Sequence, residues 1–299
     1  MSEQVRIVEV GPRDGLQNEK TPVGVAARIA FIESLVGAGL HTVEVGAFVS
    51  PRAIPQMVGS DEVLRGVNHL PGGEFHVLVP NEKGYEAARR AGARVIAVFG
   101  SASEGFSRAN INCSVAESIE RFKPVITRAI ADGIKVRGYI SCVLGCPYDG
   151  EIKPQSVVDV AKILWDLGCY EVSLGDTIGV GSPRKARQLL RAVAGSVPMA
   201  HLAMHFHDTY GQALANLYAG MEEGARVIDS AAGGLGGCPY APGASGNLAT
   251  EDLLYMLNGI GIETGVDLDK VAAASRVIGT RLGRELPSRY LKATNKQAG

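Results

Sequence analysis

The chain has 299 residues, and its 30 lysines and arginines nearly balance its 31 aspartates and glutamates, which leaves a net charge of −1. A near-neutral charge with scattered basic residues argues against a nucleic-acid-binding surface and against a basic membrane-binding patch. No apolar run reaches the roughly 18 residues that are needed to span a bilayer. The five cysteines follow no regular spacing, which favours reduced thiols in a cytoplasmic protein.

Short β-rich runs alternate with longer segments of helical period along the whole chain, and no linker divides them. We expect eight strands, at residues 5–10, 42–47, 74–79, 94–99, 135–143, 170–174, 202–206 and 227–231. Helices are expected between them, at residues 23–38, 85–91, 115–132, 155–167, 184–193 and 212–223. This alternation predicts βα units and a parallel sheet.

Eight strands fit a closed (β/α)8 TIM barrel, which leaves no sheet edge exposed. The alternative is a doubly wound open sheet, but the turn at residues 11–15 lacks the glycine spacing of a dinucleotide-binding fingerprint. We therefore expect a single catalytic domain over residues 1–299, with the barrel at about 5–257. Additional C-terminal helices at about 258–299 would cover the site or join subunits.

Two histidines end the seventh expected strand, in the sequence His-Phe-His-Asp-Thr-Tyr-Gly-Gln at residues 205–212. His205 and His207 are two positions apart, so a strand places both imidazoles on one face. Such a pair is a metal-ligand arrangement, and the alternative is two histidines packed in a core. Asp14, just past the first strand, would add a carboxylate ligand, or else it is a solvated turn residue or a helix cap.

Other polar residues stand at or near the ends of expected strands, where the chemistry of such barrels is located. Glu44 lies inside an apolar strand and needs a partner, for which Arg13 is the natural choice. Asp176 ends the sixth strand, where it would take a proton or would cap the following helix. Gln17 would orient a substrate through its amide group.

A glycine-rich loop at residues 233–240 follows the eighth strand and carries Cys238. Its glycines permit hinge conformations, and the thiol would give or take a proton or act as a nucleophile. A phosphate cradle is the alternative interpretation of these glycines.

Asn247, nine residues after that cysteine, offers an amide oxygen. Together with Asp14, His205 and His207 it would complete a ligand set of two nitrogens and two oxygens, which favours Mg or Mn. The two imidazoles keep Co, Fe and Zn as alternatives.

Three motifs carry a resemblance to a known family. Residues 10–19 (Val-Gly-Pro-Arg-Asp-Gly-Leu-Gln-Asn-Glu), the segment at 205–212 and the loop at 234–247 resemble the 3-hydroxy-3-methylglutaryl-CoA (HMG-CoA) lyases. These enzymes are a family of metal-dependent barrel lyases related to Claisen-type synthases. The His-x-His segment alone indicates only the superfamily, whereas the Cys238 loop and the Leu-Gln-Asn sequence at 16–18 resemble the lyases specifically.

The resemblance implies a role for each matching position. It implies a divalent metal held by Asp14, His205 and His207, with Asn247 close by or ligating. It also implies that Arg13 is the catalytic arginine, that Glu44 is its acidic partner, and that Cys238 is the loop cysteine.

The implied reaction is the retro-Claisen cleavage of HMG-CoA to acetyl-CoA and acetoacetate, as in leucine degradation and ketone-body metabolism. His205 or Asp176 would remove the proton of the C3 hydroxyl. Arg13 would stabilise the enolate oxygen, and Cys238 would protonate the enolate carbon. The alternatives are a Claisen synthase, a metal-dependent pyruvate-type aldolase and a non-enzymatic binding protein.

The acyl-CoA substrate would be contacted by outer loops, among which we single out Asn110. The extra C-terminal helix and the family analogy predict a homodimer. The mitochondrial forms of the family carry a presequence and a cysteine near the C-terminus. This chain resembles a bacterial cytoplasmic form, because no cysteine follows Cys238.

Overall fold

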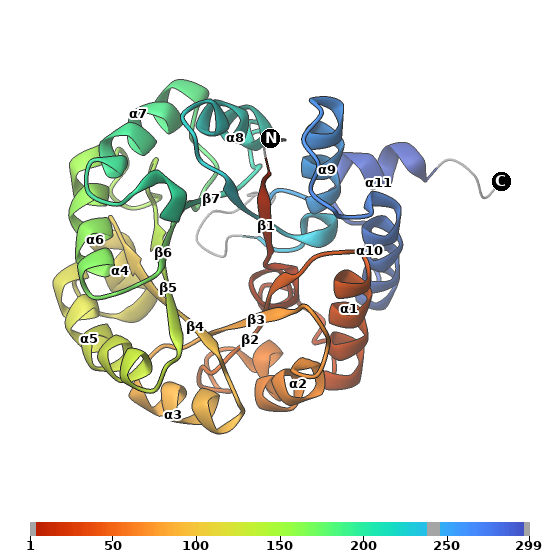
Figure 1. Ribbon diagram of the computed structural model, residues 1–299, viewed down its shortest axis with the longest axis horizontal. Helices are drawn as coiled ribbons and strands as arrows, with labels where there is room; N and C mark the ends of the chain where they lie inside the picture. The colour runs from red at the N-terminus through yellow and green to blue at the C-terminus, as the bar shows by residue number, and fades with distance from the viewer. Residues whose placement is uncertain (1–3, 238–245, 296–299) are drawn as a thin grey trace.

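The computed structural model describes residues 4–237 and 246–295 and contains a closed barrel of eight parallel strands. Each strand pairs with the next one along the chain, and the last strand pairs in parallel with the first (Figure 1). The TIM barrel predicted from the sequence is thereby confirmed. The strands are β1 (Arg6–Glu9), β2 (Thr42–Ala47), β3 (Glu74–Leu78), β4 (Val95–Ser101), β5 (Lys135–Ser141), β6 (Glu171–Asp176), β7 (Leu202–Phe206) and β8 (Val227–Ser230).

Helices surround the barrel and bury the outer faces of the strands (Figure 1). They are α1 (Val25–Gly37), α2 (Ser60–Val67), α3 (Glu82–Arg90), α4 (Glu104–Ile111), α5 (Val115–Ala131), α6 (Pro154–Asp166), α7 (Pro183–Ala194), α8 (Ala213–Glu222), α9 (Thr250–Gly259), α10 (Leu268–Leu282) and α11 (Arg289–Thr294). The helices α2 and α4 lie outside the segments that we expected to be helical. Each has 8 residues, which is too short for the helical period to stand out.

The strands alternate between an apolar outer face and a polar inner face. On β2, Val43 and Val45 join the apolar core between strands and helices, whereas Glu44 lies between them in sequence and faces the barrel interior. The interior also holds charged groups of β5 and β8, Arg137 and Asp229, which are both buried. A buried charge is tolerated only when it is paired, so the interior of this barrel is built from ion pairs as well as from packing.

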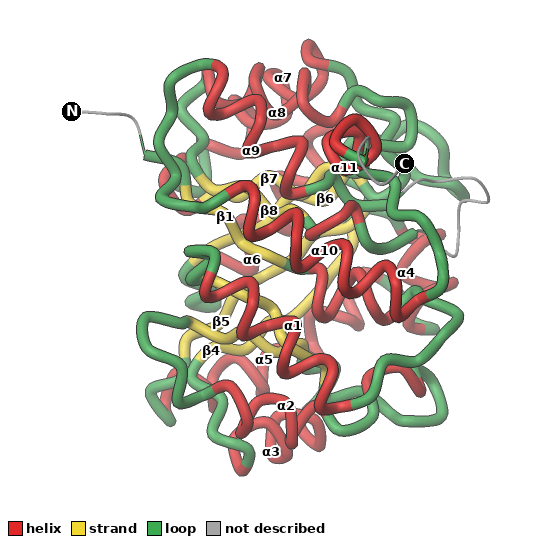
Figure 2. The backbone as a smooth tube through the Cα atoms, turned by 90° about the vertical axis from the view of Figure 1, so that its right-hand side faces the viewer, coloured by secondary structure: helices red, strands yellow, loops and turns green. Residues whose placement is uncertain are grey.

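The C-terminal helices pack on the outside of the barrel. Figure 2 shows α10 alongside α1, and the helix α11 packs against α9. Between α10 and α11, Leu286 is buried below the short 3-10 turn η4 (Ala232–Gly234) that follows β8. The extension therefore supports the segment that leads into the glycine-rich loop.

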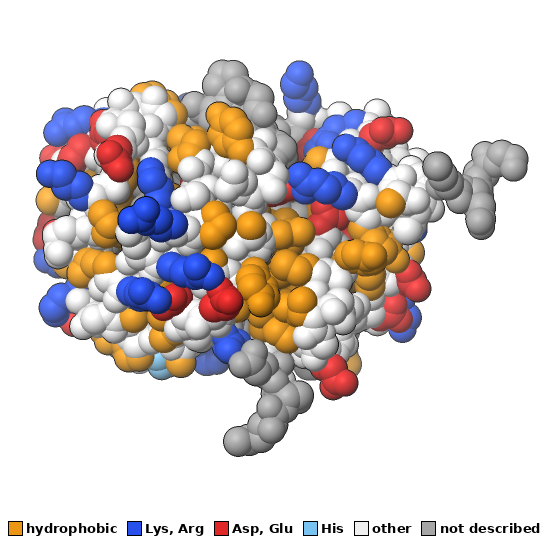
Figure 3. All heavy atoms as spheres, turned by 90° about the horizontal axis from the view of Figure 1, so that it is seen from above, with side chains coloured by type: hydrophobic (Ala, Val, Ile, Leu, Met, Phe, Trp, Pro, Cys, Tyr) orange, Lys and Arg blue, Asp and Glu red, His pale blue; other side chains and the backbone are white. Residues whose placement is uncertain are grey.

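The surface carries charges of both signs, and Figure 3 shows Lys and Arg side chains interspersed with Asp and Glu. This distribution agrees with the near-neutral net charge of the sequence. Among the described helices, none has the length and apolar character required to cross a bilayer.

Candidate active site

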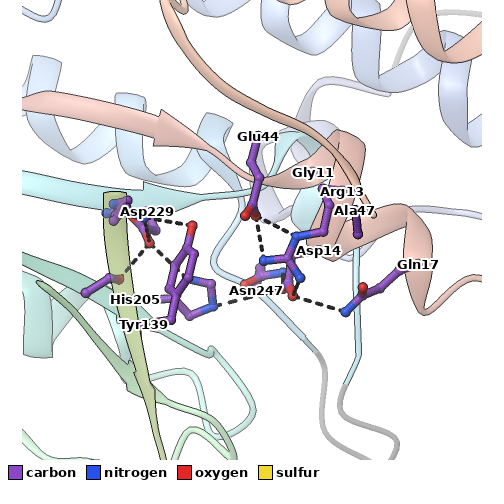
Figure 4. Close-up of polar contacts among 12 residues, drawn as sticks. Gly11, Arg13, Asp14, Gln17, Glu44, Ala47, Tyr139, His205, Asp229 and Asn247 are labelled. Carbon is purple, nitrogen blue, oxygen red and sulfur yellow. Dashed lines mark hydrogen bonds and ion pairs between the residues drawn. The ribbon is translucent and has the colours of Figure 1, made fainter. Parts of the chain in front are cut away.

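A single π-helical turn, η1 (Gly11–Gly15), follows β1 and positions the first two site residues. In a regular strand neighbouring side chains point to opposite faces, so Arg13 and Asp14 could not share a site. In the turn, Arg13 Nη1 lies 3.0 Å from Asp14 Oδ1, and both side chains face the barrel interior (Figure 4). The turn packs tightly, since a Cβ on Gly15 would lie 2.7 Å from Leu235 Cβ. The prediction that both residues face inward is confirmed.

Arg13 and Glu44 form a buried ion pair, as the sequence predicted. Arg13 donates through Nε at 2.7 Å, and its Nη2 lies 2.6 Å from the same carboxylate oxygen, Oε2 (Figure 4). Burial lowers the pKa of Arg13, but the carboxylates of Glu44 and Asp14 raise it more, so its pKa lies above the ordinary value. The guanidinium is therefore a permanent cation with a fixed orientation.

Three predicted metal ligands meet at the end of the barrel. Asp14, His205 and His207 each offer one ligand atom, and these atoms all lie within 4.8 Å of one another. His205 Nε2 is 4.0 Å from Asp14 Oδ2, and the two imidazole centroids are 5.4 Å apart. His205 lies on β7 and His207 directly follows its last residue, Phe206, and the ligand atoms of the two histidines converge, as their spacing predicted.

The protonation states of His207 and Asp14 suit a divalent cation. Burial and the neighbouring His205 lower the pKa of His207 to about 4, so this imidazole is neutral, which is the ligand form. Burial raises the pKa of Asp14, but Arg13 and the two histidines lower it by more, so the pKa lies below its ordinary value and the carboxylate is ionised. One carboxylate and two imidazoles form a donor set that fits a divalent metal ion.

Asn247 is also present, but in an orientation that we did not predict. Its amide nitrogen, and not its oxygen, faces the cluster, donating to Asp14 Oδ2 at 2.8 Å and to the Leu235 carbonyl at 3.1 Å. The backbone of Asn247 pairs with that of His207 in an isolated bridge. In this geometry Asn247 holds Asp14 in place.

Asp229 was not predicted from the sequence, and it contacts His205 from the neighbouring strand β8. Its Oδ2 lies 3.1 Å from His205 Nδ1, and it accepts a hydrogen bond from Ser173 Oγ at 2.8 Å. Burial lowers the pKa of His205, but Asp229 raises it more. A signal was available, because Asp229 is a charged residue inside an apolar strand, as is Glu44.

Asp176 is not brought into contact with the cluster. Its carboxylate accepts backbone hydrogen bonds from Val180 at 3.1 Å and from Gly181 at 2.8 Å. Ser173 on the same strand faces the interior, so Asp176, three residues later, points to the opposite side. Asp176 does not cap the following helix α7 either, because the N-cap of α7 is Ser182. Its carboxylate instead orders the loop between β6 and α7, and burial raises its pKa to about 6.

The two predicted substrate-contacting residues have different surroundings. Gln17 Nε2 lies 3.5 Å from Asp14 Oδ1, and its Oε1 is buried without a hydrogen-bond partner among the described residues. Asn110 is exposed on α4, outside the cluster. The helix α4 follows β4, so Asn110 belongs to the same end of the barrel.

Cys238 lies outside the described residues, but the segment that leads to it is held firmly. Gly233 and Gly234 adopt left-handed backbone angles, with φ of 70° and 71°. The backbone N–H of Gly233 donates to both carboxylate oxygens of Glu251, at 2.8 and 3.0 Å, and its carbonyl accepts from the N–H of Ser288 at 3.2 Å. Glu9 accepts from the backbone N–H of Ala232 at 2.8 Å.

Comparisons with known proteins agree with this fold. The model of the HMGL-like family matches residues 4–278. Hydroxymethylglutaryl-CoA lyase of Pseudomonas mevalonii is 57% identical over 285 residues, covering 95% of each chain. The crystal structure of hydroxymethylglutaryl-CoA lyase from Pseudomonas aeruginosa has a TM-score of 0.95 and 56% identity, and covers 98% of each chain. An HMG-CoA lyase structure from Acinetobacter baumannii, with coenzyme A and 3-methylmalate, has a TM-score of 0.93 at 36% identity and covers 99% of this chain and 97% of its own.

We predict that Gly233→Ala destabilises the protein more than Gly261→Ala does. Both glycines have positive φ, 70° and 78°, so an alanine at either position strains the backbone by about 1–2 kcal/mol. A Cβ on Gly233 would also lie 2.3 Å from Leu286 Cδ1, whereas a Cβ on Gly261 meets nothing within 4 Å. Overpacking should add about 1–3 kcal/mol at Gly233 alone, measured as the free energy of unfolding in urea. Equal losses would show that Leu286 does not pack against this turn.

We also predict a pH-dependent contribution of Glu251 to stability. Burial raises its pKa from 4.5 to about 7, so the folded state binds this proton more tightly than the unfolded chain does. Stability from this group is complete below pH 4.5 and is lost as the pH rises through about 7. Relative to Glu251→Gln, the wild type should lose up to about 3 kcal/mol between these limits in urea titrations. Parallel stability curves for the two proteins would contradict this assignment.

Proposed function

Because the chain belongs to the HMGL-like family, we infer that it is a hydroxymethylglutaryl-CoA lyase, which cleaves HMG-CoA to acetyl-CoA and acetoacetate. The observation that carries this inference is the convergence of Arg13, Asp14, His205 and His207 at one end of the barrel. These residues come from two distant parts of the sequence, and both parts belong to the motifs that resemble the lyases.

We propose that Asp14, His205 and His207 hold the divalent ion, with Asn247 beside it. When bound, the ion acts as a Lewis acid that lowers the pKa of the substrate C3 hydroxyl. The Asp14 carboxylate and the oxygens of the substrate favour Mg or Mn, whereas the two imidazoles also suit Co, Fe or Zn. Asn247 keeps Asp14 oriented through the hydrogen bond from its amide nitrogen.

The proton of the C3 hydroxyl needs an acceptor, and neither predicted candidate is well placed to act. The Asp176 carboxylate is occupied by backbone N–H groups of its own loop. His205 faces Asp229 with Nδ1, and a nitrogen that binds the metal ion has no lone pair left for a proton. As a ligand, His205 cannot also be the base.

We assign this proton to Glu44. Its Oε1 is buried and has no hydrogen-bond partner among the described residues, while Oε2 holds Arg13. Burial raises the pKa of Glu44 above its ordinary value, although Arg13 opposes the shift, so the carboxylate is a stronger base than an exposed one. Glu44 then has two functions: it orients Arg13 and takes the proton.

Removal of the proton leaves an alkoxide at C3, which becomes the ketone of acetoacetate as the C2–C3 bond breaks. The electron pair of that bond passes into the thioester, forming the enolate of acetyl-CoA. Arg13 stabilises the enolate oxygen, because Glu44, Asp14 and the ring of Tyr139, 5.8 Å from the guanidinium carbon, hold its guanidinium in one orientation. A fixed cation needs no reorganisation as the charge develops.

Cys238 would protonate C2 of the enolate and so complete acetyl-CoA. The residue lies outside the described part of the chain, and its assignment rests on the resemblance to the lyases. The turn at Gly233 and Gly234, five and four residues earlier, is attached to α9 and to the C-terminal segment. This attachment gives the loop a defined starting point above the barrel.

The remaining parts of the proposal concern the substrate and the assembly. Gln17 would orient the acyl group through its unpartnered Oε1, and Asn110 would contact coenzyme A from α4. One relative of this chain has been solved with coenzyme A and 3-methylmalate, which supports an acyl-CoA substrate. We propose a cytoplasmic homodimer, by analogy with the bacterial members of the family.

One prediction of the proposed function concerns the reaction itself. The purified protein, incubated with HMG-CoA, should form acetoacetate and acetyl-CoA in equal amounts. A chelator should abolish the activity, and added Mg or Mn should restore it, since the Lewis acid is removed and returned. Absence of acetoacetate from a protein that binds the metal would contradict the lyase assignment. Release of a free aldehyde from a hydroxy-oxoacid would then favour the aldolase alternative.

A further prediction tests the assignment of Glu44 as the base. Glu44→Gln keeps an oxygen that can accept from Arg13 but cannot take a proton, so kcat should fall about 10²- to 10⁴-fold. The acid limb of the pH profile of kcat should also disappear, because that limb reports the ionisation of the base. Asp176→Asn serves as the comparison. Loss of the acid limb in Asp176→Asn but not in Glu44→Gln would return the role to Asp176.

A further inference from the structure

Asp229 lies in the barrel interior beside His205, its partner in register on the neighbouring strand, and apart from His205 every polar partner that the structure describes for its side chain is a donor. Arg137 donates to both of its oxygens, through Nη2 to Oδ1 at 2.7 Å and through Nη1 to Oδ2 at 2.9 Å. Ser173 donates its hydroxyl to Oδ2 at 2.8 Å. A carboxylate with these partners is ionised and acts only as an acceptor.

This arrangement determines which nitrogen of His205 carries a proton. His205 Nδ1 lies 3.1 Å from Asp229 Oδ2 and must donate, because the carboxylate has no proton to offer. In a neutral imidazole the other nitrogen, Nε2, then has a free lone pair. That nitrogen is the one that faces Asp14, at 4.0 Å from its Oδ2.

We propose that Asp229 is the positioning residue that fixes the tautomer and the ring orientation of His205 so that Nε2 binds the metal ion. The proposal rests on the metal site assigned above. Metal-binding histidines commonly donate their second nitrogen to a carboxylate, and loss of such a partner weakens metal affinity about 10- to 100-fold. Here the carboxylate is itself held by Arg137 on β5.

Asp229 could instead have the purely structural role of neutralising Arg137. A second carboxylate that pairs with Arg137 allows the two roles to be distinguished. Glu171 accepts from Arg137 Nε at 2.7 Å and is 2% exposed, so it is paired to the same guanidinium at nearly the same burial. Among the described residues its side chain pairs with Arg137 and Arg6, and not with His205. Glu171→Gln therefore removes a buried charge from Arg137 and leaves the contact between Asp229 and His205 intact.

The test compares Asp229→Asn with Glu171→Gln in the full-length protein, both shown to be folded by circular dichroism. Mn affinity is measured by competition with a chelator, and the Co-substituted proteins are compared by visible absorption. Asp229→Asn should weaken Mn binding about 10- to 100-fold and alter the Co spectrum. Glu171→Gln should match the wild type in both. Equal losses in the two variants, or none in Asp229→Asn, would overturn the proposal.

A second measurement needs no variant of the buried ion pair and covers the case in which Asp229→Asn does not fold. In metal-free wild type labelled with ¹⁵N-histidine, two-bond proton–nitrogen correlations report the tautomer of each of the six histidines. The signals of His205 are identified by their loss in His205→Gln. The neutral ring should carry its proton on Nδ1, and a proton on Nε2 would overturn the proposal. Neither experiment measures acetoacetate, so a failure of the proposed lyase function would be seen separately.

Discussion

The ion pair between Arg137 and Asp229 supports the rest of the site. Both groups are fully buried, and removing two charges from water costs several kcal/mol for each ion unless the geometry of the pair is good. Here the pairing is bidentate, at 2.7 and 2.9 Å, and it joins β5 to β8 across the barrel. Asp229 then reaches His205 on β7, so a charge pair in the barrel interior determines how an imidazole at its open end is oriented.

A second pair, Arg13 with Glu44, serves the reacting end of the barrel in the same way. Its geometry depends on the π-helical turn after β1, which brings Arg13 and Asp14 to one side. The Glu44 carboxylate therefore orients the cation, and the Asp14 carboxylate lies at the proposed metal site. Beside the π-helical turn, Glu9 and Glu251 hold the turn that begins the glycine-rich loop, through backbone N–H groups instead of cations. The buried ion pairs of the barrel interior and the fixed turn that begins the glycine-rich loop together border the space in which the substrate would react.

Much of this arrangement could be predicted from the sequence. The alternation of strands and helices gave the closed barrel, the spacing of His205 and His207 gave their common face, and the isolated charge of Glu44 gave its pairing with Arg13. Asp229 is an isolated charge in an apolar strand, as Glu44 is, but its partner Arg137 is 92 residues away, and the sequence does not show that these two residues pair. We placed Asp176 in the site because it ends a strand. Side chains alternate between the two faces of a strand, however, so a position at the strand end does not by itself show whether the side chain points into the barrel. The orientation of the Asn247 amide depends on the Leu235 carbonyl, which only the folded chain provides.

The most direct test of the account is to locate the metal ion. Crystals of the protein grown with Mn, and measured on either side of the Mn absorption edge, would give an anomalous difference map that shows the ion and nothing lighter. We expect one peak in contact with Asp14, His205 Nε2 and His207, with Asp229 still bound to His205 Nδ1. A peak at another place in the barrel, or a site at which His205 binds through Nδ1, would contradict it.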